Sequence, residues 1–171
     1  MSHAKNKVAW CLSKARKELQ EGKRHRGLVS VAADPEKARE HISKAEHNLT
    51  VTLYLRKGGY TDWCSSSLFY VMYHCFLAIL AKRGYETRNQ ECTFALIAGL
   101  VEDRSIVISQ EDLEQVSALN ITETQESPET AVSIREEYQY STKVSLENKE
   151  YQELLQLAKR ILDQTKETLE M

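Results

Sequence analysis

The most apolar segment of the chain is residues 68–80, which read LFYVMYHCFLAIL. Apolar side chains occupy every side of a helical repeat there, and a helix of this kind has to be covered all round. We therefore expect a helix from about Asp62 to Arg83 that is central to the fold or shared with a second subunit. The run of low charge, residues 68–81, is shorter than the roughly 20 residues that cross a bilayer, so no membrane association is expected.

The flanking segments predict further helices. Residues 4–21 carry one apolar stripe at helical spacing. Asp34 can cap the next helix, Pro35 fits its first turn, and Gly58 can end it. Similar patterns predict helices at about residues 87–101, opened by a capping box from Thr87 to Gln90, and at 109–119, 130–141 and 146–169.

Strand patterns are nearly absent, and short joints between long helices favour antiparallel neighbours. The prediction is an all-α fold, a single domain over residues 1–171 built as an up-and-down bundle of five to six helices.

The composition excludes several other classes of protein. The length of 171 residues and the 42% share of apolar side chains suit one domain with a substantial core. Six Gly and two Pro are too few for a loop-rich or sandwich fold, and the frequent apolar residues with a net charge of only −2 argue against a long disordered chain. The N-terminus runs into an amphipathic pattern rather than the apolar stretch of a signal peptide, so a cytoplasmic location is expected.

The four cysteines, Cys11, Cys64, Cys75 and Cys92, include no CxxC pair, and so no zinc site is predicted. An even count would allow two disulfides, but without a secretory signal we expect buried, reduced thiols.

Charge is distributed unevenly along the chain. Residues 1–26 contain eight Lys and Arg against two acidic residues, whereas residues 101–171 contain seven against sixteen. A basic leading segment can indicate an anionic ligand. The alternative is that two solvated helix faces attract each other across a bundle or a dimer.

Two adjacent motifs carry a family resemblance. Residues 62–74 read DWCSSSLFYVMYH, and residues 81–93 read AKRGYETRNQECT. Together they resemble the HEPN domain of higher eukaryotic and prokaryotic nucleotide-binding proteins. Its uncharacterised prokaryotic branch, which the chain resembles most, often shows Tyr-Tyr-Ala-Met-aromatic-His, then Lys-x-Gly, then an Arg-Asn-His-Glu-Cys-like turn. Gln90 stands where the family usually has histidine. The family-like core is expected at about residues 35–104, with helices over 109–170 completing the bundle.

The resemblance implies a helical bundle that pairs into a homodimer with a cleft between the subunits. Many members of the family are metal-independent ribonucleases, and others pair with a minimal nucleotidyltransferase in toxin–antitoxin-like modules or sense nucleotides. The family's catalytic signature is an Arg followed by a His after four to six residues, because Arg steadies phosphate charge while His moves the proton of the 2′-hydroxyl. None of the five histidines here has that spacing from a preceding Arg.

Arg88 and Asn89, followed by Gln90, are the leading candidates for contacting phosphate. They lie at a predicted helix N-terminus, where free N–H groups and the helix dipole favour an anion, and Arg adds a planar fork. The alternative is a solvent-exposed first turn in which Asn89 and Gln90 cap the helix.

His74 is either a hydrogen-bonded core residue or a proton carrier in a cleft. Tyr70 and Tyr73 beside it are either core residues or surfaces on which bases stack. His74 and Arg88 are the candidates for a catalytic role. Secondary candidates for nucleotide binding come from a basic cluster and from a late segment, and they are Lys23, Arg24, Arg26, Arg135, Tyr138 and Tyr140.

The leading hypothesis is a HEPN-type homodimer that binds a nucleotide, RNA or a nucleotidyltransferase partner without strong catalysis. One alternative is a metal-independent ribonuclease with a rearranged site made of Arg88, His74 and a tyrosine. The other is a purely structural oligomerisation module. No motif for a metal or a cofactor is present, and none is expected.

Overall fold

The computed structural model describes residues 2–118, 142 and 144–171. This part of the chain is mostly helical, with little strand, which confirms the all-α prediction. The helices are α1 (His3–Gln20), α2 (Pro35–Lys57), α3 (Asp62–Lys82), α4 (Gln90–Glu102), α5 (Gln110–Ala118) and α7 (Asn148–Glu170). The predicted helix at 130–141 lies outside the described residues, as do Arg135, Tyr138 and Tyr140.

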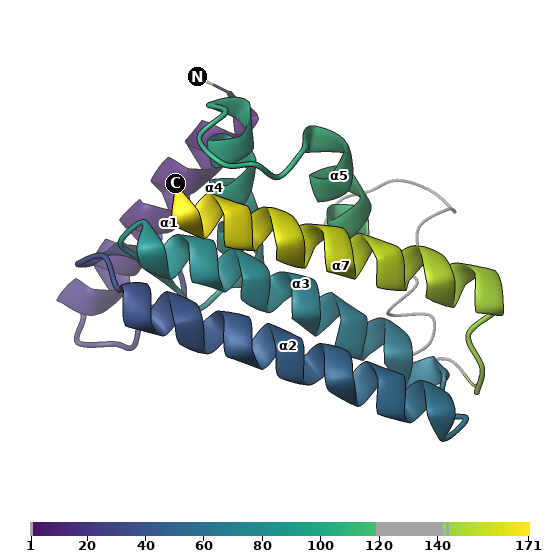
Figure 1. Ribbon diagram of the computed structural model, residues 1–171. Coiled ribbons are helices and arrows are strands. Elements are labelled where there is room, and N and C mark those ends of the chain that lie inside the picture. Colours follow the sequence, from purple (N-terminus) through teal and green to yellow (C-terminus); the bar gives the residue numbers. More distant parts are fainter. Residues whose placement is uncertain (1, 119–141, 143) are drawn as a thin grey trace.

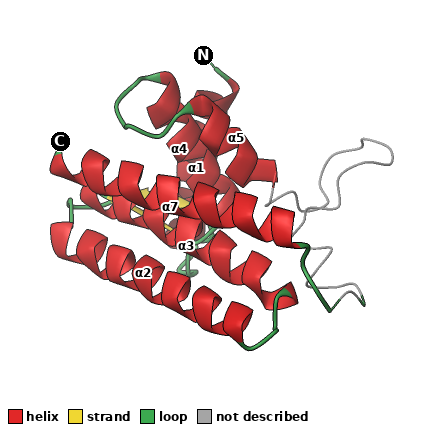
Figure 2. Cartoon of the chain, turned by 45° about the vertical axis from the view of Figure 1, so that its right-hand side comes forward, coloured by secondary structure: helices red, strands yellow, loops and turns green. Residues whose placement is uncertain are grey.

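Three long helices, α2, α3 and α7, lie side by side (Figure 1), and α1 lies next to α4 behind them (Figure 2). α2 and α3 are antiparallel across a short turn. α7 runs beside α3 in the same direction, as the contacts at both of their ends demonstrate. The Thr61 hydroxyl accepts the Leu146 N–H at 2.9 Å where the two helices begin, and the Lys82 ammonium donates to the Leu169 carbonyl where they end.

Helix α3 is the central helix, as its sequence predicts. It packs against α2, α7, α4 and a short strand, and its fully buried side chains include Leu68, Phe69, Met72, Phe76 and Ile79. Its length and apolar composition would suit a membrane span, but about two thirds of its most apolar part is buried inside the bundle. Its hydrophobicity is therefore accounted for by the protein core.

Most of the start signals in the sequence are confirmed. The Asp34 carboxylate accepts the Lys37 N–H at 2.8 Å, and Pro35 opens α2. The cap of α4 is different from the prediction, because Asn89 rather than Thr87 caps this helix and its side chain accepts the Cys92 N–H at 3.0 Å.

Thr87 has another role because it belongs to a small sheet that the sequence pattern did not predict. Strands β1 (Leu28–Ser30) and β2 (Tyr85–Thr87) pair antiparallel, with Leu28 opposite Thr87. Strands of three residues are too short to show an alternating pattern. Gly84 precedes β2 with a φ of +77°, and a Cβ there would lie 2.7 Å from the Val31 carbonyl oxygen, so this turn requires glycine.

The expectation of four reduced cysteines is half wrong. Cys64 and Cys75 are free and buried as predicted, but Cys11 and Cys92 form a disulfide that joins α1 to α4. The two residues are 81 positions apart. Nothing local in the sequence brings them together, because their contact depends on how α1 docks on α4.

Candidate functional site

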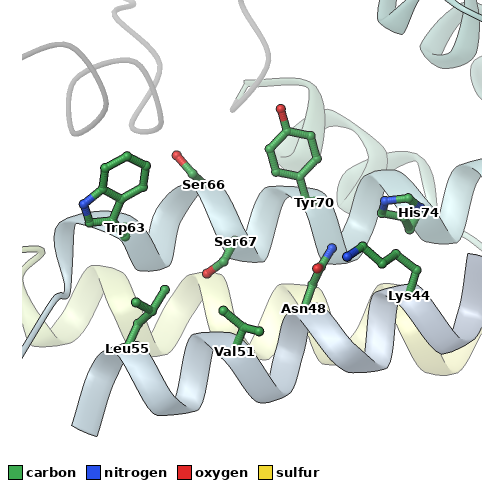
Figure 3. A pocket seen from close by; sticks show the side chains of 9 residues that line it. All are labelled: Lys44, Asn48, Val51, Leu55, Trp63, Ser66, Ser67, Tyr70 and His74. Atoms are coloured by element: carbon green, nitrogen blue, oxygen red, sulfur yellow. The ribbon is translucent and has the colours of Figure 1, made fainter. Parts of the chain in front are cut away.

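A groove of about 440 Å³ runs along the seam between α2 and α3 (Figure 3). Its volume is in the range of small-molecule pockets. Aliphatic side chains line the α2 side together with an ammonium and an amide, and aromatic rings, hydroxyls and an imidazole line the α3 side. The lining residues are Lys44, Asn48, Val51 and Leu55 from α2, and Trp63, Ser66, Ser67, Tyr70 and His74 from α3.

Two aromatic rings project from α3 at the groove. Trp63 is 58% exposed and Tyr70 is 43% exposed, which is unusual for such large apolar groups on the central helix. They are seven residues apart, so two helical turns and about 10 Å separate them along the axis. Ser66 lies between them on the same side (Figure 3). This face of α3 therefore offers two separate ring surfaces and a hydroxyl.

A second imidazole lies against the groove residue His74. His74 of α3 and His41 of α2 approach with their Nδ1 atoms 3.1 Å apart, so one Nδ1–H donates and the other Nδ1 accepts. Burial, together with the charges of the neighbouring His74 and Lys37, lowers the pKa of His41 to about 4. Burial also lowers the pKa of His74, with a smaller contribution from Lys44. Both rings are neutral at pH 7.

Hydrogen bonds fix the floor of the groove. The Ser67 and Thr52 hydroxyls are 2.7 Å apart. Each also lies within hydrogen-bonding distance of a backbone carbonyl of its own helix. The buried Thr52 thus ties α2 to α3 beneath the lining residues. The groove is a preformed feature of the α2–α3 pair rather than a gap between mobile segments.

Arg88 is not among the groove residues. Its Nε donates to Glu86 Oε1 at 2.9 Å, and the buried His25 approaches the same carboxylate oxygen through Nε2 at 3.2 Å. Burial raises the pKa of Glu86, but the hydrogen bonds from His25 and Arg88 outweigh that effect and lower it. Much of the charge that Arg88 could offer a phosphate is therefore already balanced.

The other predicted site residues are distributed over the molecule. Tyr73 is largely buried, stacks on Phe69 and places its hydroxyl 3.3 Å from that of Thr93 on α4. Asn89 is occupied as the α4 cap, and Gln90 is the first residue of that helix. The structure thus brings Tyr70 and His74 together and leaves Arg88, Asn89 and Gln90 elsewhere, at the start of α4.

The basic cluster at 23–26 is partly neutralised. Lys23 pairs with Glu21 at 2.8 Å, and Arg26 pairs with Glu18 at 3.3 Å. Arg24 is exposed. Within residues 2–118 and 144–171, no group of three or more His, Cys, Asp and Glu side chains is placed to hold a metal ion.

The matched segment of the chain settles its family. The family model of the HEPN domain matches residues 38–168, from the first turn of α2 to the last turns of α7. The chain belongs to the HEPN domain family. The HEPN match includes both walls of the groove, whereas α1 and β1 precede it. None of the curated proteins compared with the chain matches it. Membership places the chain among helical domains associated with nucleotides and RNA.

The sequence prediction did not include several groove residues, although their spacing along the chain gives a signal. Lys44, Asn48, Val51 and Leu55 follow one another at steps of three and four, which is one stripe of a helix. This stripe runs next to the buried stripe of α2 and lines one wall of the groove. The stripe on α2 does not predict a groove by itself, because the groove forms only where α3 lies alongside it.

Proposed function

We propose that this HEPN domain binds single-stranded RNA as a homodimer and that the α2–α3 groove receives the bases. The exposed rings of Trp63 and Tyr70 carry the proposal. Aromatic side chains stack on bases of any sequence, with about 1–3 kcal/mol for each stacked base. Membership of the HEPN family supports the same class of ligand.

The spacing of the two rings suits successive bases of one strand. Trp63 and Tyr70 are about 10 Å apart along α3, so each ring can stack on a base of its own. The Ser66 hydroxyl between the rings can then bond a ribose or phosphate oxygen.

The polar groups of the groove fit the remainder of a nucleotide. The Lys44 ammonium supplies a positive charge for a phosphate, and the Asn48 amide can donate to and accept from a base edge. The neutral imidazole of His74 can do the same without adding charge. The aliphatic side chains of Val51 and Leu55 offer the bases an apolar wall.

Fluorescence anisotropy with a labelled six-nucleotide RNA tests this proposal. Tyr70→Ala should weaken binding about tenfold, which corresponds to 1.4 kcal/mol, because one stacking surface is lost. Tyr70→Phe keeps the ring and should bind nearly as tightly as the wild type. Unlabelled AMP and inorganic phosphate serve as competitors, and both should compete far less well than the hexamer. Equal affinity of Tyr70→Ala and the wild type would refute the groove as the binding site.

A second candidate function is metal-independent RNA cleavage in the same groove, favoured by the meeting of His74, His41 and Lys44. When His74 donates through Nδ1 to His41, its Nε2 holds a lone pair that can take the proton of a 2′-hydroxyl. The 2′ oxygen then bonds to the adjacent phosphorus, the bond from phosphorus to the 5′ oxygen breaks, and water protonates the leaving oxygen. Lys44 would stabilise the charge on the phosphate.

Incubation of end-labelled RNA with the purified protein tests the cleavage. The products should be a 2′,3′-cyclic phosphate and a 5′-hydroxyl, the reaction should be insensitive to EDTA, and His74→Ala should abolish it. Arg88→Ala is the matched control, because Arg88 lies outside the groove. Intact RNA after long incubation would leave RNA binding as the function, and cleavage that survives His74→Ala would exclude His74 as the base.

A further inference from the structure

The outer face of α1 carries a stripe of basic residues around one tryptophan. His3, Lys7, Trp10, Lys14 and Lys17 follow one another at steps of four and three, which places them in one row along the helix. We call this row the α1 stripe. It lies outside the segment that matches the HEPN family, and no part of it lines the groove.

Trp10 is the centre of the α1 stripe. Its side chain is 47% exposed, and the ammonium groups of Lys7 and Lys14 lie 4.3 Å and 4.9 Å from its ring centroid. Cation–π contacts hold the two lysines against the indole. The result is a half-exposed ring with two ammonium groups over it, in a helix whose inner face is fixed by the Cys11–Cys92 disulfide.

We infer that the α1 stripe is a second contact surface for single-stranded RNA, at which Trp10 stacks on a base and Lys14 and Lys17 bind phosphates. RNA is taken as the ligand because this inference rests on the proposed function. Basic residues interleaved with an aromatic ring suit a strand that offers phosphates and bases in alternation. The net positive charge of residues 1–26 adds a favourable long-range field.

Two other occupants fit the α1 stripe less well. An anionic membrane would need a continuous apolar face to insert, but Ala4, Cys11 and Ala15 of α1 are buried, and the exposed Trp10 and Leu19 are nine residues apart, on opposite sides of the helix. An acidic protein surface would use the lysines without needing an exposed ring. Lys7 already pairs with Glu91, so Lys14 and Lys17 are the residues to test.

The chain has two tryptophans, one at each surface, so the fluorescence of each surface can be measured separately. The Trp63→Phe protein retains Trp10 alone, and the Trp10→Phe protein retains Trp63 alone in the groove. Each is titrated with a twenty-nucleotide RNA while tryptophan emission is recorded, and with phosphatidylserine vesicles in parallel. We expect the RNA, and not the vesicles, to quench the emission of both proteins.

Removal of charge gives the second readout. Lys14→Gln with Lys17→Gln should weaken binding of the twenty-nucleotide RNA about tenfold at 0.1 M salt. It should also reduce the slope of log K against log salt by about 1.4, since each phosphate contact with a single strand contributes about 0.7. The matched control is Lys149→Gln with Lys159→Gln, two exposed lysines on α7, which should leave both quantities unchanged.

The outcomes separate the two surfaces. Unchanged Trp10 emission at an RNA concentration that quenches Trp63 overturns the inference and leaves the groove intact. Quenching of Trp10 without Trp63 overturns the groove and supports the α1 stripe. A response of Trp10 to vesicles but not to RNA, or an equal loss of affinity in the α7 control, also overturns the inference.

Discussion

At the scale of single residues, the contact between His41 and His74 makes stability depend on pH. Burial, followed by the charges of His74 and Lys37, lowers the pKa of His41 from 6.5 to about 4. The unfolded chain therefore binds this proton near pH 6.5, while the folded protein resists it down to about pH 4. The stabilisation is fully present above pH 6.5 and is lost as the pH falls towards 4.

We expect the free energy of unfolding to fall by about 1 kcal/mol between pH 7 and pH 5. This is less than the pKa shift alone would give, because the rings are partly exposed and solvent screens their interactions. Urea denaturation at the two pH values measures it. Carboxylates contribute little above pH 5, since their pKa values lie lower. His41→Gln should show a weaker dependence than the wild type, and an unchanged dependence would contradict the assignment to His41.

At the scale of elements, the disulfide fastens α1, which precedes the HEPN match, to α4 within it. It closes a loop with 81 positions between its ends, so it restricts the unfolded chain strongly. Cys11→Ala with Cys92→Ala should lower the free energy of unfolding by about 2–4 kcal/mol in urea denaturation. Dithiothreitol should destabilise the wild type and leave the double variant unchanged. If the reductant has no effect on the stability of either protein, the crosslink does not stabilise the fold.

An element can be predicted from the sequence where short-range interactions specify it, and not where long-range contacts do. Asp34 and Pro35 act within one helical turn, so α2 was predicted nearly to the residue. The β1–β2 pairing, by contrast, joins residues 28 and 87, which are distant in the sequence. Because Thr87 belongs to this sheet, Asn89 rather than Thr87 caps α4. The groove likewise needs stripes from two helices. Tyr70 and His74 could be named as candidate site residues because polar groups are unusual on an apolar helix. Lys44 gives no such signal, because only its position beside α3 places it in the groove.

At the scale of the whole molecule, exposed aromatic residues gather where α2 passes into α3. Tyr54 is 77% exposed and Tyr60 is 60% exposed, and neither lines the groove. Large apolar side chains grouped on a surface typically mark an interaction site. We expect this end of the α2–α3 pair to form the subunit contact of the proposed homodimer.

Sedimentation equilibrium should then give a mass of twice 19.6 kDa for the wild type. Tyr54→Asp with Tyr60→Asp should reduce it to that of one chain, because each buried and unpaired carboxylate in the contact would cost several kcal/mol. Leu19→Asp is the matched control, since Leu19 is 49% exposed on α1 and should leave the dimer intact. A wild type that sediments as a single chain at high concentration would exclude the homodimer, and dissociation by the Leu19 variant alone would move the contact to α1. In a dimer built at the α2–α3 turn, the two grooves start from the shared contact, and one RNA strand could then reach both.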